Sequence, residues 1–274
     1  SKFTAKNATI NINYIPDVIS SQVLQNYLIN IYASKSIPPS GNSNEVVKFL
    51  ESKLHKIAMN SNTKQLEEIV IQLPNSPRWS RWKKWYVEYN LMRKNDKKAC
   101  NQVKILLDSD TSISLQKANI ICLLINQKTN EAKFIHDLLK SQNLLDELYL
   151  ELFNHIIMES NPKDIKLKKT EFEPIHIVML DILKYPIKAN MIANLGPEYS
   201  ESLIDLIYVE PETRSFLLDR IISTKKIDQL GYEFIRDNGG HSAPLYYRGF
   251  KKSLCTSLNH VVCHGIPSDR VLNE

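Results

Sequence analysis

The middle of the chain decides the fold, where residues 112–158 read SISLQKANIICLLINQKTNEAKFIHDLLKSQNLLDELYLELFNHIIM. Apolar residues recur there every three to four positions in three successive runs, a spacing that predicts amphipathic helices of about four turns. The runs lie near 112–126, 129–141 and 144–158. Short polar joints at 126–128 and 141–143 separate them, and joints this short make neighbouring helices antiparallel.

A helix pair of this size has a period close to the roughly 34 residues of tetratricopeptide-type repeats, although the repeat consensus is absent. Glycine is scarce, with 7 residues in 274, which argues against β folds with many tight turns and against phosphate-binding loops. We therefore predict an all-α fold, an α-solenoid of antiparallel helix pairs. Its N-terminal segment is irregular, and the alternation over 9–14 permits one short strand.

Composition and punctuation divide the chain into five segments. An N-terminal segment with a first helix covers 1–44, and a helical-repeat domain covers 45–160. The charged stretch 161–172 reads as a linker, 173–258 as a C-terminal helical-repeat region, and 259–274 as an irregular tail. Helices of the C-terminal region are expected near 173–184, 187–194, 200–208, 211–223, 227–237 and 244–258.

The strongest candidate for a binding surface is the basic, tryptophan-rich helix at 78–98. Its three tryptophans are spaced three apart and share a helix face. The candidate contacts are Arg78, Trp79, Arg81, Trp82, Lys83, Lys84 and Trp85. Such a helix can bind an acidic protein, nucleic acid through phosphate contacts and base stacking, or an anionic membrane surface. The structural alternative is an aromatic stripe packed between helices with solvated basic side chains.

The second candidate is a run of acidic residues that no Lys or Arg interrupts. Glu198, Glu201 and Asp205 lie in it, followed by Glu210 and Glu212. This run can bind a basic partner or the basic helix of a second copy. Its structural alternative is a solvated face with Glu212 in a helix first turn.

Metal-binding patterns are weak. Cys255, His260, Cys263 and His264 are metal-capable, but their spacing fits a zinc site poorly. The segment 108–112 resembles the start of a calcium loop but lacks the later Gly and Glu, so Asp110 or Thr111 is better read as a helix N-cap. We predict no metal and no cofactor.

Cysteine usage and hydropathy bear on the compartment. Cys122 lies in an apolar run, as a buried cysteine does, and one Cys255–Cys263 bridge stays open. No stretch approaches the roughly 20 apolar residues of a membrane span. A cytoplasmic location is slightly favoured. Export or a periplasmic location after leader removal stays open, because the chain begins at Ser1.

Two segments carry a family resemblance, QKANIIC at 116–122 and FEPIHIVML at 172–180. With these segments the chain resembles a group of uncharacterised alphaproteobacterial helical-repeat proteins over roughly 110–236. The shared motifs are apolar and structural. The resemblance implies a bacterial α-solenoid without an assigned activity, and no functional residue is carried over.

No catalytic motif is visible: the seven histidines are scattered, and there is no nucleophile elbow, zinc-peptidase helix or phosphate loop. An enzyme with a site dispersed along the chain is the least favoured hypothesis. We expect a non-enzymatic scaffold or adaptor that binds an unidentified protein through a helical-repeat surface. The alternative is an RNA-binding helical-repeat protein that uses the helix 78–98. The oligomeric state is not readable.

Overall fold

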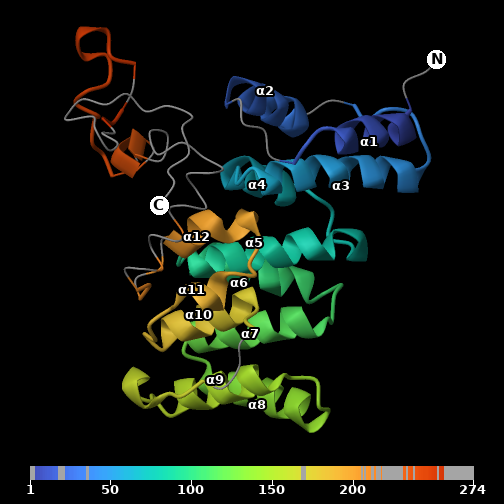
Figure 1. Ribbon diagram of the computed structural model, residues 1–274. Helices are drawn as coiled ribbons and strands as arrows, with labels where there is room; N and C mark the ends of the chain where they lie inside the picture. Colours follow the sequence, from blue (N-terminus) through green and yellow to red (C-terminus); the bar gives the residue numbers. More distant parts are fainter. Residues whose placement is uncertain are drawn as a thin grey trace. The chain divides into compact units, whose positions relative to one another are not determined.

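The computed structural model describes residues 4–17, 22–34, 37–167 and 171–204, and shorter stretches as far as Cys255 (Figure 1). The shorter stretches are 206, 208–210, 213, 217, 231–232, 234–236, 238–251 and 253–255. The chain forms two compact units. The first unit combines Ser1–Thr63 with Leu218–Glu274, and the second unit is Lys64–Leu217. The predicted linker 161–172 therefore lies inside the second unit and does not separate the two units.

The first unit begins with three helices, α1 (Ala5–Tyr14), α2 (Gln22–Ala33) and α3 (Ser43–Met59). Helix α1 replaces the short strand that we expected over 9–14. The Thr4 hydroxyl caps it by accepting the Asn7 backbone N–H at 3.3 Å. Ala5 and Ala8 lie on one face of α1 and pack against Phe49 of α3. This tertiary packing outweighs the local alternation, which had suggested a strand.

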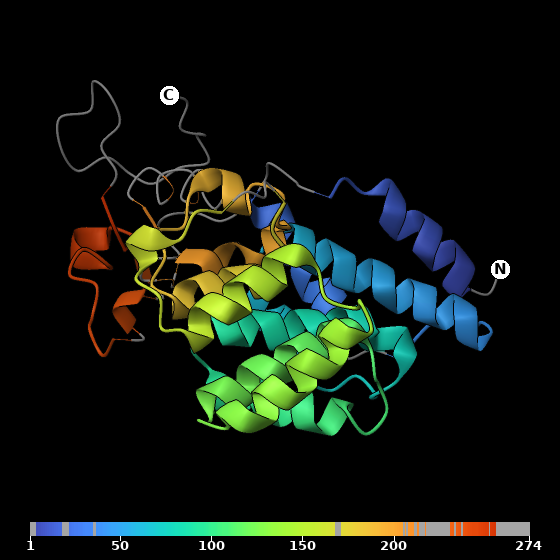
Figure 2. The same ribbon diagram turned by 90° about the horizontal axis from the view of Figure 1, so that it is seen from below.

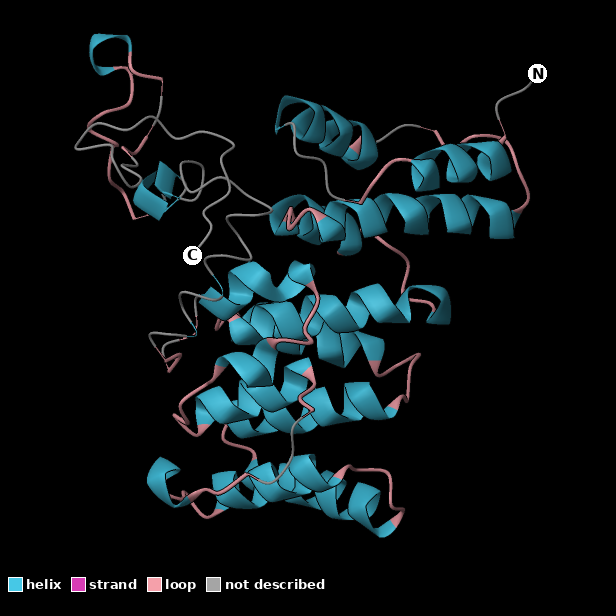
Figure 3. Ribbon diagram, viewed as in Figure 1, coloured by secondary structure: helices cyan, strands magenta, loops and turns pink. Residues whose placement is uncertain are grey.

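The second unit holds a longer series of helices. They are α4 (Thr63–Val70), η1 (Pro77–Trp79), α5 (Ser80–Met92), α6 (Asp96–Leu106), α7 (Ile113–Ile125), α8 (Thr129–Ser141), α9 (Glu147–Ile157), η2 (Pro162–Asp164), α10 (Pro174–Ile182), α11 (Ala189–Ile192), η3 (Pro197–Tyr199) and α12 (Ser200–Ile204). Figure 3 shows only helices and loops in the described part of the chain, where two isolated β-bridges are the sole strand-like pairings. The described residues form helices, turns and loops, which is consistent with an all-α fold.

Consecutive helices of the second unit pack side by side, α5 on α6, α6 on α7 and α7 on α8 (Figures 1 and 2). The chain then returns, and both α10 and α12 pack against α5. Helix α5 thus has neighbours from both ends of the unit. Repeats of a simple solenoid contact only their sequence neighbours. The contacts of α10 and α12 with α5 join helices that are not sequence neighbours, which a simple solenoid does not do. The solenoid arrangement therefore stays a prediction.

The predicted helices near 112–126, 129–141 and 144–158 correspond to α7, α8 and α9. The helix predicted at 244–258 is wrong over its described residues, which form turns and the short helix η4 (Tyr247–Gly249). Tyr246, Arg248 and Gly249 take left-handed φ angles of 66°, 49° and 83° there, and these break a helix. Of the helix predicted at 211–223 the structure describes only residues 213 and 217, and of the helix predicted at 227–237 it describes residues 231–232 and 234–236. All of these described residues are helical.

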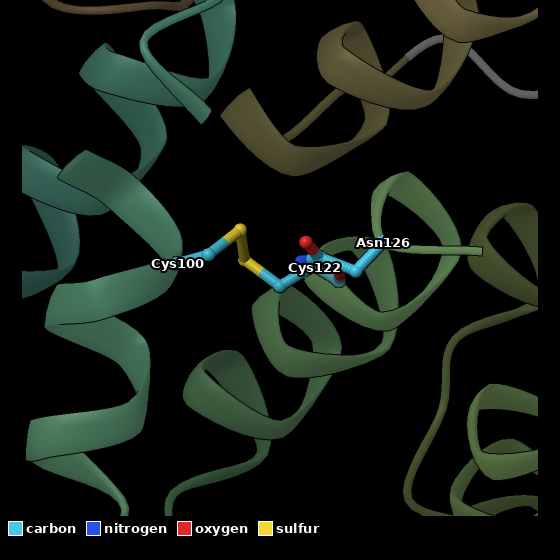
Figure 4. Close-up of a disulfide and its surroundings, with 3 residues drawn as sticks. All are labelled: Cys100, Cys122 and Asn126. Atoms are coloured by element: carbon cyan, nitrogen blue, oxygen red, sulfur yellow. Dashed lines mark hydrogen bonds between the residues drawn. A yellow bond between two sulfur atoms is a disulfide. The ribbon is translucent and has the colours of Figure 1, made fainter. Parts of the chain in front are cut away.

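A disulfide joins Cys100 of α6 to Cys122 of α7 (Figure 4). Cys122 is buried, as its apolar run indicated, and its pairing with Cys100 was not predicted. The Cα atoms are 5.4 Å apart, within the range that a disulfide spans. Asn126 in the same figure donates its side-chain N–H to the Cys122 carbonyl oxygen at 2.7 Å. The bridge thus links two neighbouring helices near the end of α7.

Among the described residues, no helix combines the length and the apolar character that crossing a bilayer requires.

Candidate functional site

A cavity of about 410 Å³ opens in the second unit beside α5. Its walls are the first half of α5, the end of α6 and the start of α7 with the loop before it. Charged side chains of both signs line it, together with hydroxyls and small apolar groups. They are Arg81, Lys83, Lys84, Glu88 and Asp110, with Ser80, Ser109, Thr111, Ser112, Ser114, Pro77, Val87, Leu106, Leu115 and Ala118.

Glu88 is an acidic group of this wall whose side chain is only 3% exposed. The Tyr199 hydroxyl donates to Oε2 at 2.6 Å, and the Lys84 ammonium lies 3.6 Å from Oε1. Burial raises the pKa of Glu88 to about 7, although Lys84 and Tyr199 both act to lower it. A carboxyl that exchanges its proton near neutral pH inside a cavity is a candidate acid–base group.

Glu88 also predicts a pH-dependent stability. Its pKa is raised in the folded state, so its contribution to stability is full below the unfolded pKa near 4.5 and is lost as pH rises through about 7. We expect Glu88→Gln to gain about 2–3 kcal/mol relative to wild type when the comparison moves from about pH 5 to pH 8. Urea unfolding at both pH values measures this gain. An unchanged difference between the two proteins would contradict it.

Two lysines of the cavity wall lie in different environments. Lys83 is buried, and its ammonium donates to the Ile71 carbonyl oxygen at 3.3 Å. Burial lowers the pKa of Lys83. Lys84 is partly exposed and pairs with Glu88. Of these two lysines, Lys84 is therefore the one whose ammonium group can also contact a ligand in the cavity.

A second cluster of charged groups joins α7, α9 and α10. The Lys117 ammonium, on a side chain only 8% exposed, lies 2.6 Å from Asp146 and 3.4 Å from Glu173. Asp146 caps α9 by accepting the Tyr149 backbone N–H at 3.0 Å. The Tyr149 hydroxyl donates to the Lys117 carbonyl oxygen at 2.9 Å. One buried cation thus holds two carboxylates from different elements.

Asp146, Glu173 and His176 bring three metal-capable atoms within 4.8 Å of one another. His176 accepts the Glu173 backbone N–H at Nδ1, so its ring proton lies on Nε2, which is 3.2 Å from Asp146. A metal requires an unprotonated ring nitrogen, and the Lys117 ammonium already pairs with both carboxylates. The residues therefore fit a charge network around Lys117 better than a metal site.

The tryptophan stripe of η1 and α5 is a core feature, which corrects its interpretation as a contact surface. Trp79, Trp82 and Trp85 are 5%, 3% and 3% exposed, and Lys83 is 2% exposed. The Trp85 indole N–H donates to the Glu198 carbonyl oxygen at 3.2 Å. Buried rings are not available to stack on bases or to anchor a partner. The return of α10 and α12 onto α5 supplies the burial.

The remaining predicted contacts are more open. Arg78 and Arg81 are exposed, and Lys84, Glu198 and Glu201 are partly exposed. Binding of a protein partner by these side chains stays a prediction. Among the other predicted contacts, Asp205 lies outside the described residues. So does Glu212, which we had placed in the same acidic run.

The other sequence candidates have simpler outcomes. Asp110 accepts the Ser112 backbone N–H at 2.8 Å, a local turn directly before α7, where Ser112 is the N-cap. Cys255 is exposed. His260, Cys263 and His264 lie outside the described residues, so the structure does not test a Cys255–Cys263 bridge.

Comparison with known proteins gives a different indication of function. The chain is 47% identical to the methionine aminopeptidase of Rickettsia prowazekii over 66 residues, which are 23% of this chain and 26% of that protein. It is 55% identical to the mitochondrial methionine aminopeptidase 1D of Dictyostelium discoideum over 51 residues, 19% of this chain and 13% of that protein. Methionine aminopeptidase 2 of Mycobacterium tuberculosis matches at 45% over 53 residues, 19% of each.

The chain thus spans about a quarter or less of the length of these curated relatives. No protein-family model and no solved structure matches it.

These relatives correct three predictions. The resemblance to alphaproteobacterial helical-repeat proteins is wrong, because the relatives are peptidases. The prediction of a non-enzymatic scaffold or adaptor is wrong for the same reason, and its RNA-binding alternative has no support. The expectation that the chain is not an enzyme is contradicted by relatives that all carry an enzyme's name. The error arose because helix periodicity dominates most of the chain, while the matched stretch is short.

Proposed function

We propose that this chain takes part in removing methionine from the amino terminus of peptides. The observation that supports the proposal is the identity of 45–55% to three methionine aminopeptidases over 51–66 residues. The similarity is short but high, and it recurs with enzymes from bacteria and from a eukaryotic mitochondrion. It covers 19–23% of this chain.

We further propose that the matched stretch is the end of the chain, about 209–274, which is the final 66 residues. Residue types suited to a hydrolytic site gather there. Five of the seven glycines are Gly231, Gly239, Gly240, Gly249 and Gly265. Three of the seven histidines are His241, His260 and His264, and two of the four cysteines are Cys255 and Cys263.

The chemistry of these residue types supports that placement. Glycine lets the backbone approach a peptide closely and adopt left-handed turns, and Gly239 and Gly249 have φ angles of 73° and 83°. Histidine is the commonest side chain for proton transfer in catalysis. Between residues 64 and 208 the chain has a single glycine, Gly196, which lies outside the helices, so the helices of the second unit need neither property.

The activity is tested by incubating the purified full chain with a peptide that begins Met-Ala-Ser and measuring free methionine by mass spectrometry. We expect methionine release from the peptide with a free amino terminus and none from its N-acetylated form. Absence of release from the free peptide would refute the proposed activity.

Single substitutions test the placement of the matched stretch. We expect at least one of His241→Ala, His260→Ala and His264→Ala to lower the rate by about 100-fold, the scale of lost acid–base catalysis. The matched control is His155→Ala in α9 of the second unit, which we expect to keep the wild-type rate. Equal rates in all four variants would show that the histidines of 209–274 do not take part in the reaction.

A further inference from the structure

We propose that the cavity beside α5 binds a free α-amino acid with an apolar side chain. This site is additional to the proposed peptidase activity, because its walls are built from residues 77–118 of the second unit. The volume of about 410 Å³ lies in the range of small-molecule sites, roughly 300–1,000 Å³. The cavity brings together cationic, anionic and apolar side chains.

The first kind is cationic. Arg81 and Lys84 are three residues apart on α5 and share a helix face at the cavity. The Arg81 guanidinium lies over the Trp82 ring, 5.0 Å from its centroid, and within the described residues it has no carboxylate partner. A guanidinium held against a ring presents a planar fork of donors that matches a carboxylate. Arg81, assisted by Lys84, is the group for the carboxylate of the ligand.

The second kind is anionic. Glu88 and Asp110 line the same cavity from α5 and from the loop before α7. Glu88 is buried and accepts from Tyr199, which fixes the position of its carboxyl group. Asp110 uses one oxygen for the Ser112 backbone N–H. Carboxyl oxygens held in this way are acceptors for the ammonium group of a ligand.

The third kind is apolar. Val87, Leu106, Leu115 and Ala118 contribute small and branched aliphatic surface to the same walls. A purely anionic ligand would be repelled by Asp110 and by the ionised form of Glu88, and a purely cationic ligand by Arg81 and Lys84. A molecule with one charge of each sign and an aliphatic branch satisfies all three kinds of group.

Titration calorimetry of the full chain with L-leucine tests the proposal. Leucine is used because it is not the amino acid that the proposed peptidase reaction releases. We expect L-leucine to bind, and N-acetyl-L-leucine and L-leucinamide, which each lack one charge, to bind at least about tenfold more weakly. No binding of L-leucine, or equal binding of the three compounds, would overturn the proposal.

Variants assign the binding to this cavity. We expect Arg81→Gln to weaken L-leucine binding by about tenfold or more. The control Arg78→Gln removes a neighbouring exposed arginine that does not line the cavity, and we expect wild-type affinity. Equal affinities of these two variants would overturn the assignment. Helical circular dichroism confirms that both are folded, and methionine release measured in parallel separates this result from the proposed activity.

Discussion

Replacing Lys117 by Met is expected to destabilise the chain by about 1.5–3 kcal/mol, because the partly buried Asp146 loses a short charge-assisted hydrogen bond and Glu173 loses a longer one. The Lys117 ammonium lies 2.6 Å from Asp146 and 3.4 Å from Glu173 on a side chain that is 8% exposed. Methionine keeps most of the volume of the side chain and removes the charge. The free energy of unfolding in urea measures the loss.

A matched control separates this network from a surface ion pair. Lys128 pairs with Glu131 at 2.9 Å, but both side chains are more than half exposed. We expect Lys128→Met to cost less than about 1 kcal/mol, because solvent screens exposed pairs. Equal losses in the two variants would show that the Lys117 network contributes no more than a surface pair.

The same network sets an acid dependence. Burial alone would raise the pKa of Asp146, but interactions with His176, Lys117 and the Tyr149 backbone N–H hold that pKa well below its usual range. A carboxyl with a lowered pKa stabilises the fold above its unfolded pKa, near 4, and loses that contribution as pH falls. We therefore expect the stability of wild type to fall more steeply in acid than that of Lys117→Met.

Reducing the Cys100–Cys122 disulfide is expected to destabilise the chain by about 3 kcal/mol. The two cysteines are 22 residues apart, and releasing a loop of that length restores about this much chain entropy to the unfolded state. For a unit of this size the loss lowers the melting temperature by about 10 °C. Thermal unfolding followed by circular dichroism, with and without dithiothreitol, measures the shift.

The cysteine variants provide the control. We expect Cys100→Ala/Cys122→Ala to melt near the reduced wild type and to be insensitive to reductant. Cys255→Ala, which leaves the bridge intact, should melt like oxidised wild type. A melting temperature of wild type that does not change with reductant would show that the bridge has no part in stability.

Much of the fold was predictable from local pattern. Helices α7, α8 and α9 match the predicted runs closely, because each buries one stripe of apolar residues and ends at a polar joint. Helix α5 was harder to interpret. Its tryptophans indicated one apolar face, yet nearly the whole helix is buried, because α10 and α12 return to cover it. Local periodicity carries no information about partners so distant in sequence.

The candidate sites were less predictable for a related reason. Arg81, Lys83 and Lys84 were singled out from charge, but the cavity they share with Glu88 and Asp110 requires α6 and α7 to fold against α5. Lys117 and Glu173 are 56 residues apart and match no spacing motif. The Cys100–Cys122 pairing likewise depends on how α6 packs on α7.

The return of the chain over α5 has a consequence for synthesis. The Trp85 indole finds its acceptor at Glu198, 113 residues later in the chain. At a translation rate of roughly 5–20 residues per second, about 6–23 seconds pass before the ribosome has made that acceptor. During this interval the three tryptophans of η1 and α5 lack the elements that cover them. The nascent chain therefore exposes an aromatic surface that can aggregate. We expect chaperones that bind exposed apolar surface to raise the yield of soluble protein.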